Sequence, residues 1–169
     1  MFQRARSEEQ REARRQAILG AAAAMLAEMP VAEVTLNELS RRAGLAKSNV
    51  LRYFESREAV LLELLDSAWQ DWLAQLDAEL AGAVVAGDPV ASRADQLAAA
   101  VAASLAARPM LCDLISAQAA VLERNVSPQV AAQYKRASIA GISALGALLL
   151  RSVPNSASRT RSGWPARPS

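Results

Sequence analysis

The segment from Thr35 to Gly44 leaves room for only a short helix, and this limit constrains how the surrounding chain can fold. Thr35 is followed three residues later by Glu38, which is the capping-box pattern that opens a helix. Gly44 suits the position just past a helix end, because glycine adopts the left-handed backbone conformation without a steric penalty. Only the residues "GLA" separate this helix from the next segment of helical periodicity. The sequence therefore predicts two short helices joined by a tight glycine turn.

The second of these short helices has an apolar face and a polar face. Val50 and Phe54 are four residues apart, so they share one side, where they pack inward with Leu45. The remaining surface displays small polar and basic side chains, namely Lys47, Ser48, Asn49 and Arg52. This arrangement fits a helix into the major groove of DNA, but polar-faced helical hairpins are also common in other proteins. The pattern therefore indicates a helix-turn-helix and leaves a helical interaction module as the alternative.

Capping residues and prolines divide the rest of the chain into longer helices, and no segment has the pattern of a strand. A capping box at Ser7 and Gln10 predicts a first helix from Ser7 to about Glu28. Further helices are expected over residues 57–80, 89–108, 110–123 and 128–150. The inward stripe of the helix that begins at Pro89 is predicted to comprise Val90, Ala94, Leu97, Val101 and Leu105. The fold class that follows is all-α.

The composition favours packed helices and excludes most enzyme chemistry. Apolar residues make up 52% of the chain and aromatic residues only 4%, which favours helices over a sheet. Because the chain has no histidine and one cysteine, Cys112, we expect no metal site, no cofactor, no disulfide and no enzymatic activity. The N-terminus lacks a signal-peptide pattern, and the longest late uncharged run is shorter than the roughly 20 residues of a membrane helix. A cytoplasmic protein without membrane contact is the expectation.

Charge is distributed unevenly along the chain. Residues 1–57 carry ten Lys and Arg against seven Asp and Glu, a balance of +3, whereas residues 58–150 carry five against ten, a balance of −5. A basic N-terminal end favours a polyanionic partner, although solvated helix faces often carry a similar excess.

The segment from about residue 7 to residue 65 resembles the TetR family of transcriptional regulators. The matching elements are Thr35, "AGL" at residues 43–45, "YF" at residues 53–54 and "SREAVL" at residues 56–61. The resemblance implies that the contacts with the major groove are made by Lys47, Ser48, Asn49 and Arg52. It implies phosphate contacts by Tyr53 and Arg57, and secondary DNA contacts by Thr35 and Asn37. In such an interface asparagine reads adenine and arginine reads guanine, whereas phosphate contacts carry no sequence preference.

Beyond this segment the resemblance is architectural, and it implies a helical body that dimerises and binds a small-molecule effector. The candidate effector-binding side chains are Trp69, Trp72, Met110, Leu114, Gln118 and Tyr134. Their spacing is equally typical of ordinary core packing, and this alternative stays open. The expected organisation is a DNA-binding domain over residues 1–55, a ligand-binding and dimerisation domain over residues 56–151, and a tail over residues 152–169.

The composition changes abruptly at Ser152. From there the chain has three prolines, five serines and no acidic residue, which predicts a disordered tail. TetR family members continue into two further helices that form much of the dimer interface, so the change suggests a truncated or frame-shifted regulator and argues against a complete interface. Taken together, the sequence predicts a ligand-responsive repressor that binds a palindromic operator in double-stranded DNA as a homodimer. The alternative is a truncated helical interaction protein that does not bind DNA productively.

Overall fold

The computed structural model describes residues 2–85, 87–122 and 124–152, and all regular structure within them is helical. The first elements are α1 (Phe2–Leu26), the short 3-10 helix η1 (Val31–Glu33), α2 (Leu36–Arg42) and α3 (Lys47–Val50). The longer helices follow as α4 (Arg57–Ala83), α5 (Val90–Ala106), α6 (Pro109–Leu122) and α7 (Pro128–Ser152). The expected all-α class is confirmed. The predicted tail lies outside the described residues except for Ser152, which ends α7.

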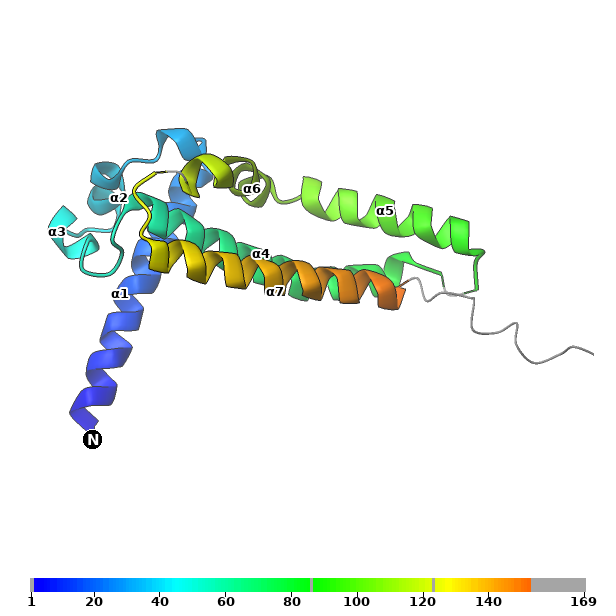
Figure 1. Ribbon diagram of the computed structural model, residues 1–169, viewed down its shortest axis with the longest axis horizontal. Helices are drawn as coiled ribbons and strands as arrows, with labels where there is room; N and C mark the ends of the chain where they lie inside the picture. The colour runs from blue at the N-terminus through cyan, green and yellow to red at the C-terminus, as the bar shows by residue number, and fades with distance from the viewer. Residues whose placement is uncertain (1, 86, 123, 153–169) are drawn as a thin grey trace, which may run out of the picture.

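The helices form an elongated body with the short helices gathered at one end (Figure 1). α4 runs along the body and packs against α5, α6 and α7, and α7 lies beside it over most of its length. α1 packs against α2 and α4 through its C-terminal half, while its N-terminal half projects away from the body. α4 is therefore the element that joins the module of α1, α2 and α3 to the rest of the molecule.

Side-chain caps confirm two of the predicted helix starts. Thr35 Oγ1 accepts a hydrogen bond from the backbone N–H of Glu38 at 3.2 Å, and Ser56 Oγ accepts one from Ala59 at 3.1 Å. Each cap provides a partner for an N–H group that the first turn of a helix leaves unbonded. The predicted start of the first helix at Ser7 is wrong, because α1 continues through Ser7 to Phe2.

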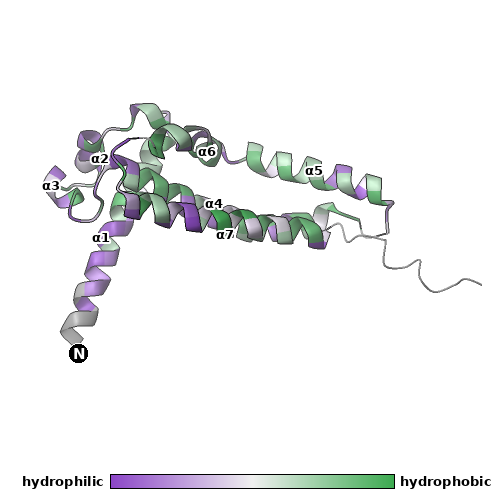
Figure 2. Cartoon of the chain, in the orientation of Figure 1, coloured by the Kyte–Doolittle hydropathy of each residue, from purple (hydrophilic) through white to green (hydrophobic). Residues whose placement is uncertain are grey.

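One apolar core extends from the short helices into the body. At the end that carries α2 and α3, it contains the fully buried side chains of Ile18, Met25, Leu39 and Val50. In the body it is built mainly on α4 and includes Leu76, Leu80, Leu111, Leu114 and Leu148. Burying a side chain of this kind contributes roughly 1.5–3 kcal/mol relative to leaving it exposed. In Figure 2, the coloured part of α1 that projects beyond this core is largely hydrophilic, whereas α4 is largely hydrophobic.

α5 differs from the inward stripe predicted for it. The last three members of that stripe pack against the core, but the first two, Val90 and Ala94, are exposed. Ser104 is buried instead, because its hydroxyl accepts hydrogen bonds from Trp72 Nε1 at 3.0 Å and from Arg108 Nη1 at 2.8 Å. These polar contacts fix the rotation of the helix, which hydrophobic spacing alone does not reveal.

Among the described residues, no single helix is both long enough and apolar enough to cross a bilayer. α5 and α6 meet those conditions only when they are taken together, and a bend of 88° separates them. Arg108 braces this bend, since its Nη2 donates to Gln75 Oε1 and to Glu79 Oε1 on α4, each at 2.7 Å.

Candidate DNA-binding interface

The turn between α2 and α3 has the geometry that the sequence predicts. Gly44 has a φ of +65°, in the left-handed region that glycine tolerates and other residues rarely adopt. The backbone N–H of Leu45 then donates to the carbonyl of Ser40 at 3.0 Å, which closes the end of α2. Behind the turn, the buried side chains of Leu39 and Val50 hold α2 and α3 together.

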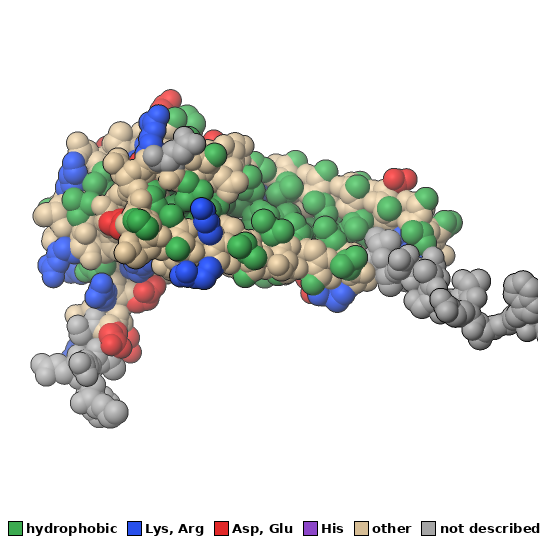
Figure 3. All heavy atoms as spheres, viewed as in Figure 1, with side chains coloured by type: hydrophobic (Ala, Val, Ile, Leu, Met, Phe, Trp, Pro, Cys, Tyr) green, Lys and Arg blue, Asp and Glu red, His purple; other side chains and the backbone are tan. Residues whose placement is uncertain are grey.

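The predicted polar face of the second short helix points into solvent. Lys47, Ser48, Asn49 and Arg52 are all exposed, whereas Val50 and Phe54 are buried beneath them. The helix itself is a single turn, Lys47–Val50, and a series of turns continues it to Phe54, whose N–H donates to the carbonyl of Val50 at 3.1 Å. No side chain caps its start, because Ala46 occupies the capping position. Figure 3 shows Lys and Arg side chains around this end of the molecule.

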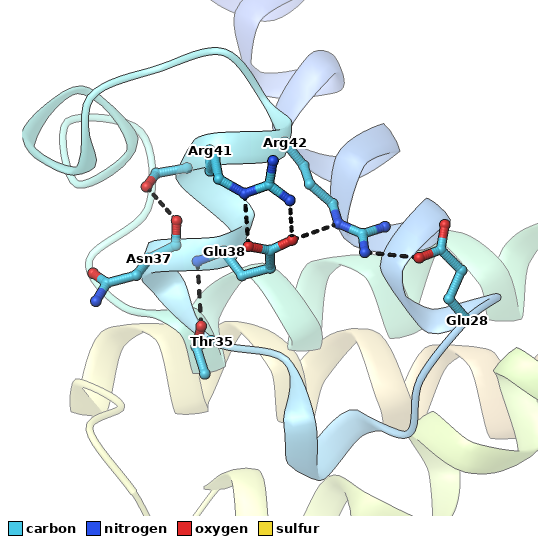
Figure 4. A network of polar contacts seen from close by, with 7 residues as sticks. Glu28, Thr35, Asn37, Glu38, Arg41 and Arg42 are labelled. Atoms are coloured by element: carbon cyan, nitrogen blue, oxygen red, sulfur yellow. Dashed lines mark hydrogen bonds and ion pairs between the residues drawn. The ribbon is translucent and has the colours of Figure 1, made fainter.

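A network of two arginines and two glutamates stabilises α2 and connects it to the end of α1 (Figure 4). Glu38 Oε1 accepts from Arg41 Nη2 at 2.6 Å and from Arg42 Nε at 2.9 Å, and Arg42 Nη2 also contacts Glu28 Oε2 at 2.7 Å. The hydrogen bonds from Arg41 and Arg42 lower the pKa of Glu38 to about 2, and Arg42 lowers the pKa of Glu28. Both carboxylates therefore remain charged at neutral pH, and they neutralise the two arginines.

Thr35 and Asn37, at the start of α2, differ in how free they are to meet DNA. The Thr35 hydroxyl already accepts the capping bond from Glu38, which leaves its O–H as the group that can donate outward. The Asn37 side chain is exposed and points away from the ion-pair network, while its backbone carbonyl accepts from Ser40 Oγ at 2.8 Å (Figure 4).

Arg57, predicted to bind phosphate, is engaged within the protein. Its Nη1 donates to the carbonyl of Val34 at 2.7 Å, and its Nε lies 3.2 Å from Glu58 Oε1. Glu58 is itself buried, and the bond from Arg57 to Val34 ties the start of α4 to the segment that leads into α2. A contact between Arg57 Nη1 and phosphate would require the bond to Val34 to be released.

A cleft is lined by Arg52, Tyr53 and three residues of α1 that were not predicted to contact DNA. The cleft has a volume of about 340 Å³, and its remaining lining residues are Gln10, Arg11 and Arg14. Arg11 and Arg14 are three residues apart, so they share one face of α1. That spacing is visible in the sequence, but the proximity of α1 to Tyr53 is a tertiary feature.

Arg15 connects three elements at the base of this region. Its guanidinium forms an ion pair with Glu63 on α4, and its Nη1 donates to the backbone carbonyl of Tyr53 at 3.1 Å. The same group lies 4.5 Å from the centre of the Phe54 ring, within range of a cation–π interaction. Arg15 was also not predicted, because its partners are distant in sequence.

Two further hydrogen bonds link the short helices to the body. The backbone N–H of Val31 in η1 donates to Asp113 Oδ2 of α6 at 2.8 Å. The N–H of Ser127, just before α7, donates to Glu55 Oε1 at 2.7 Å. α6 and the residue that precedes α7 thus each contact the part of the chain that carries α3.

The residues predicted to bind an effector do not line one common cavity. Trp69, Gln118 and Tyr134 line a cavity of about 180 Å³ between α4, α6 and α7. Trp72 and Met110 line a separate cavity of about 890 Å³ near the junction of α5 and α6, with residues of α1 and α4. Leu114 is buried in the core and lines neither of them. The structure thus brings Trp69, Gln118 and Tyr134 together, and an effector-binding role for the six side chains stays a prediction.

The two tryptophans of α4 are held differently. They form an edge-to-face pair with ring centroids 5.0 Å apart, and Trp72 Nε1 donates to Ser104. Trp69 Nε1 is buried and has no hydrogen-bond partner in the structure. It lies against Gly141 of α7, where a Cβ atom would be 2.6 Å from it. Tyr134, in the same cavity, donates to Gln118 Oε1 at 2.5 Å.

A helix-turn-helix with an exposed polar face, carried at one end of an all-helical body, defines the class of helix-turn-helix transcriptional regulators. A family model described as bacterial regulatory proteins of the tetR family matches residues 18–64. A second model, described as the tetracyclin repressor-like C-terminal domain, matches residues 66–161. The chain belongs to the TetR family of transcriptional regulators. The two matched segments meet within α4, the helix that joins the module to the body.

Individual proteins are similar to this chain over shorter segments or at lower identity. The HTH-type transcriptional regulator EthR of Mycobacterium tuberculosis is 42% identical over 50 residues, a match that covers 30% of this chain and only 23% of that protein. A TetR transcriptional regulator from Rhodococcus sp. RHA1 has a similar fold, with a TM-score of 0.51 and 19% identity over 86% of this chain and 70% of its own. A putative tetR family regulator from Shewanella sp. PV-4 aligns with a TM-score of 0.49 and 22% identity, over 82% of this chain and 68% of its own.

Proposed function

We propose that this TetR family regulator binds double-stranded DNA by inserting α3 and the following turns into the major groove. The observation that carries this proposal is the polar face of Lys47, Ser48, Asn49 and Arg52, which is fully exposed above a buried apolar support. A face of this kind, behind a glycine turn, presents donors and acceptors to base edges without any rearrangement of the fold.

The exposed residues divide into base-reading and positioning groups. Asn49 is suited to a bidentate contact with adenine, which is worth about 1–3 kcal/mol of discrimination against other bases. Lys47 and Ser48 lie beside it and extend the contact along the groove. Thr35, Asn37 and Tyr53 hold the module on the sugar-phosphate backbone, which fixes its register but carries no sequence information.

We infer that the protein acts as a homodimer on a palindromic operator. Three large apolar side chains of α7 are exposed, with 66% of Ile139, 62% of Ile142 and 75% of Leu150 accessible to solvent. Their spacing of 3 and 8 residues places them on one face of α7, and clustered exposed apolar side chains are typical of an interaction site. In a dimer, two copies of α3 would contact half-sites about 34–36 Å apart, one turn of DNA.

The proposed regulatory role is that of a repressor that releases DNA when a small molecule binds the body. The cavity of Trp69, Gln118 and Tyr134 lies between α4, α6 and α7, and α6 and α7 also contact the DNA-binding module. A ligand that binds more tightly to one arrangement of these helices would shift the spacing of the two recognition helices.

The decisive experiment is the recovery of genomic DNA fragments bound by the purified protein, followed by titration of the enriched sequence. Asn49→Ala should weaken binding to the enriched sequence by roughly 5- to 150-fold, the equivalent of about 1–3 kcal/mol, and weaken random DNA far less. Gln70→Ala, on the exposed surface of α4, serves as the control. Failure to enrich any sequence, with the helical circular dichroism spectrum intact, would instead favour an interaction protein that does not bind DNA.

The dimer is tested separately by light scattering. Ile139→Glu together with Ile142→Glu should convert the dimer to a monomer and lower operator affinity, because charges on the contact surface oppose burial. A wild-type protein that is monomeric at micromolar concentration would contradict the proposed dimer.

A further inference from the structure

The cleft between α1 and the turns after α3 is lined by three arginines and two neutral polar residues. Arg11 and Arg14 form one wall and Arg52 and Tyr53 the other, and Gln10 completes the lining. Among the described residues, no acidic side chain lines the cleft. Glu12, which lies between the two α1 arginines in sequence, accepts a hydrogen bond from Gln16 Nε2 at 2.8 Å instead of pairing with them.

These three arginines differ from the six arginines that are held in ion pairs. Ion pairs bind Arg15, Arg41, Arg42, Arg57, Arg108 and Arg151 to carboxylates. Within the part of the chain that the structure describes, the side chains of Arg11, Arg14 and Arg52 form neither an ion pair nor a hydrogen bond. Three like charges around one cleft repel one another, and nothing in the lining offsets that repulsion. Their donors are available to an external anion.

The cleft is also preformed. The α1 wall is fixed because Ile18, Ala22 and Met25 are fully buried on the same continuous helix. The opposite wall is tied to α1 by Arg15, whose Nη1 donates to the carbonyl of Tyr53 at 3.1 Å. Binding an anion here therefore requires only the ordering of exposed side chains, which reduces the entropic cost of association.

We propose that this cleft binds a phosphate of the DNA backbone, so that α1 forms part of the DNA interface together with α3. Planar guanidinium groups and a phenol O–H match the oxygens of a phosphodiester in charge and in donor geometry. The inference rests on the proposed function, and it extends the DNA contacts to Gln10, Arg11 and Arg14. It also assigns Arg52 to phosphate instead of guanine, because Arg52 shares the cleft with Tyr53.

Salt-dependent binding of DNA tests the proposal, because each phosphate contact releases counterions. The variant Arg11→Gln with Arg14→Gln is compared with Ala140→Glu and Ala147→Glu, an exposed α7 pair off the face of Ile139 and Ile142 and with the same change in net charge. Glutamine is a good helix former, so α1 should persist, and circular dichroism verifies this. The probe is a random-sequence duplex of about 30 base pairs, long enough for two half-sites one turn apart.

The expected result is a roughly ten-fold or greater loss of affinity for the α1 variant at moderate salt, with random and enriched DNA weakened alike. The slope of log affinity against log salt should become shallower by about 1 for each protomer bound, while the α7 pair leaves it unchanged. Arg52→Gln should behave like the α1 variant and lose no sequence preference. An unchanged slope in the α1 variant, or an equal loss in the α7 control, would overturn this inference alone. Absence of DNA binding by the unaltered protein would overturn the proposed function as well.

Discussion

Arg15 on α1 and Glu63 on α4 form an ion pair at the point where the DNA-binding module meets the body. Because the Arg15 guanidinium also bonds to Tyr53 and lies against the Phe54 ring, one side chain connects the first helix, the end of the recognition segment and the helix that enters the body. The contacts of Arg15 are therefore more numerous than those of its partner.

Replacing Arg15 should destabilise the protein more than replacing Glu63. Arg15→Gln leaves the Tyr53 carbonyl without its donor and removes the cation–π contact, so we expect a loss of about 1–2 kcal/mol in the free energy of unfolding. Glu63→Gln retains an acceptor for Arg15, and the pair is about a third exposed, so its cost should stay below about 1 kcal/mol. Urea denaturation of both single variants and the double variant measures the coupling. Equal losses in the two single variants would contradict this account.

Gly44→Ala should strain the turn before α3. A φ of +65° costs a residue with a Cβ atom roughly 1–2 kcal/mol, although open space surrounds the site. Gly20→Ala is the matched control, since Gly20 lies in the middle of α1 with nothing near its Cβ position, and there alanine should stabilise by about 0.5–1 kcal/mol. The melting temperature should therefore fall in Gly44→Ala and rise in Gly20→Ala. A shift in the same direction in both variants would refute the strain at Gly44.

Gly141→Ala should displace Trp69. The added Cβ atom would lie 2.6 Å from Trp69 Nε1, closer than van der Waals contact permits, so the indole or α7 must shift at a cost of about 1–3 kcal/mol. Gly146→Ala, one turn further along the same helix, meets nothing within 4 Å and should be neutral or stabilising. Tryptophan fluorescence and thermal unfolding report both effects. An unchanged emission spectrum and melting temperature in Gly141→Ala would show that the contact is not tight.

The ion-pair network of α2 should make stability depend on pH in acid. The folded-state pKa of Glu38, about 2, lies below its ordinary value of 4.5, so the charged form is favoured by folding. Its contribution is fully present above pH 4.5 and is lost as the pH falls towards 2. Glu38→Gln should therefore flatten the loss of stability over this range, as followed by thermal unfolding. Glu33→Gln, at an exposed site in η1, is the control. Identical acid profiles for the wild type and Glu38→Gln would exclude this role.

Local signals explain why the helix-turn-helix was predictable. The side chains of Thr35 and Ser56 bond to N–H groups three residues away, and Gly44 adopts a backbone conformation that glycine favours. Because these effects are local, they are visible in the sequence. The start of α1 was predicted wrongly because a capping pattern marks only a possible helix start. In the structure the helix continues through Ser7 to Phe2.

Features that depend on helix rotation and long-range proximity were not predictable from one sequence. Trp69 and Trp72 are three residues apart on α4, yet they line different cavities because α5 and α7 cover different sides of that helix. The arginine cleft likewise requires α1 to lie beside Tyr53. The DNA-contacting set and the boundary at residues 55 and 56 stay predictions.

The projecting half of α1 has a mechanical consequence. Between Ile18, where the helix is anchored in the core, and Phe2, the helix spans roughly 24 Å at 1.5 Å per residue. A change in tilt of roughly 10° about the anchor would swing the tip by roughly 4 Å. A small change in the tilt of α1 at Ile18 therefore becomes a much larger displacement at Phe2. A helix that ended at the surface of the body would not show this displacement.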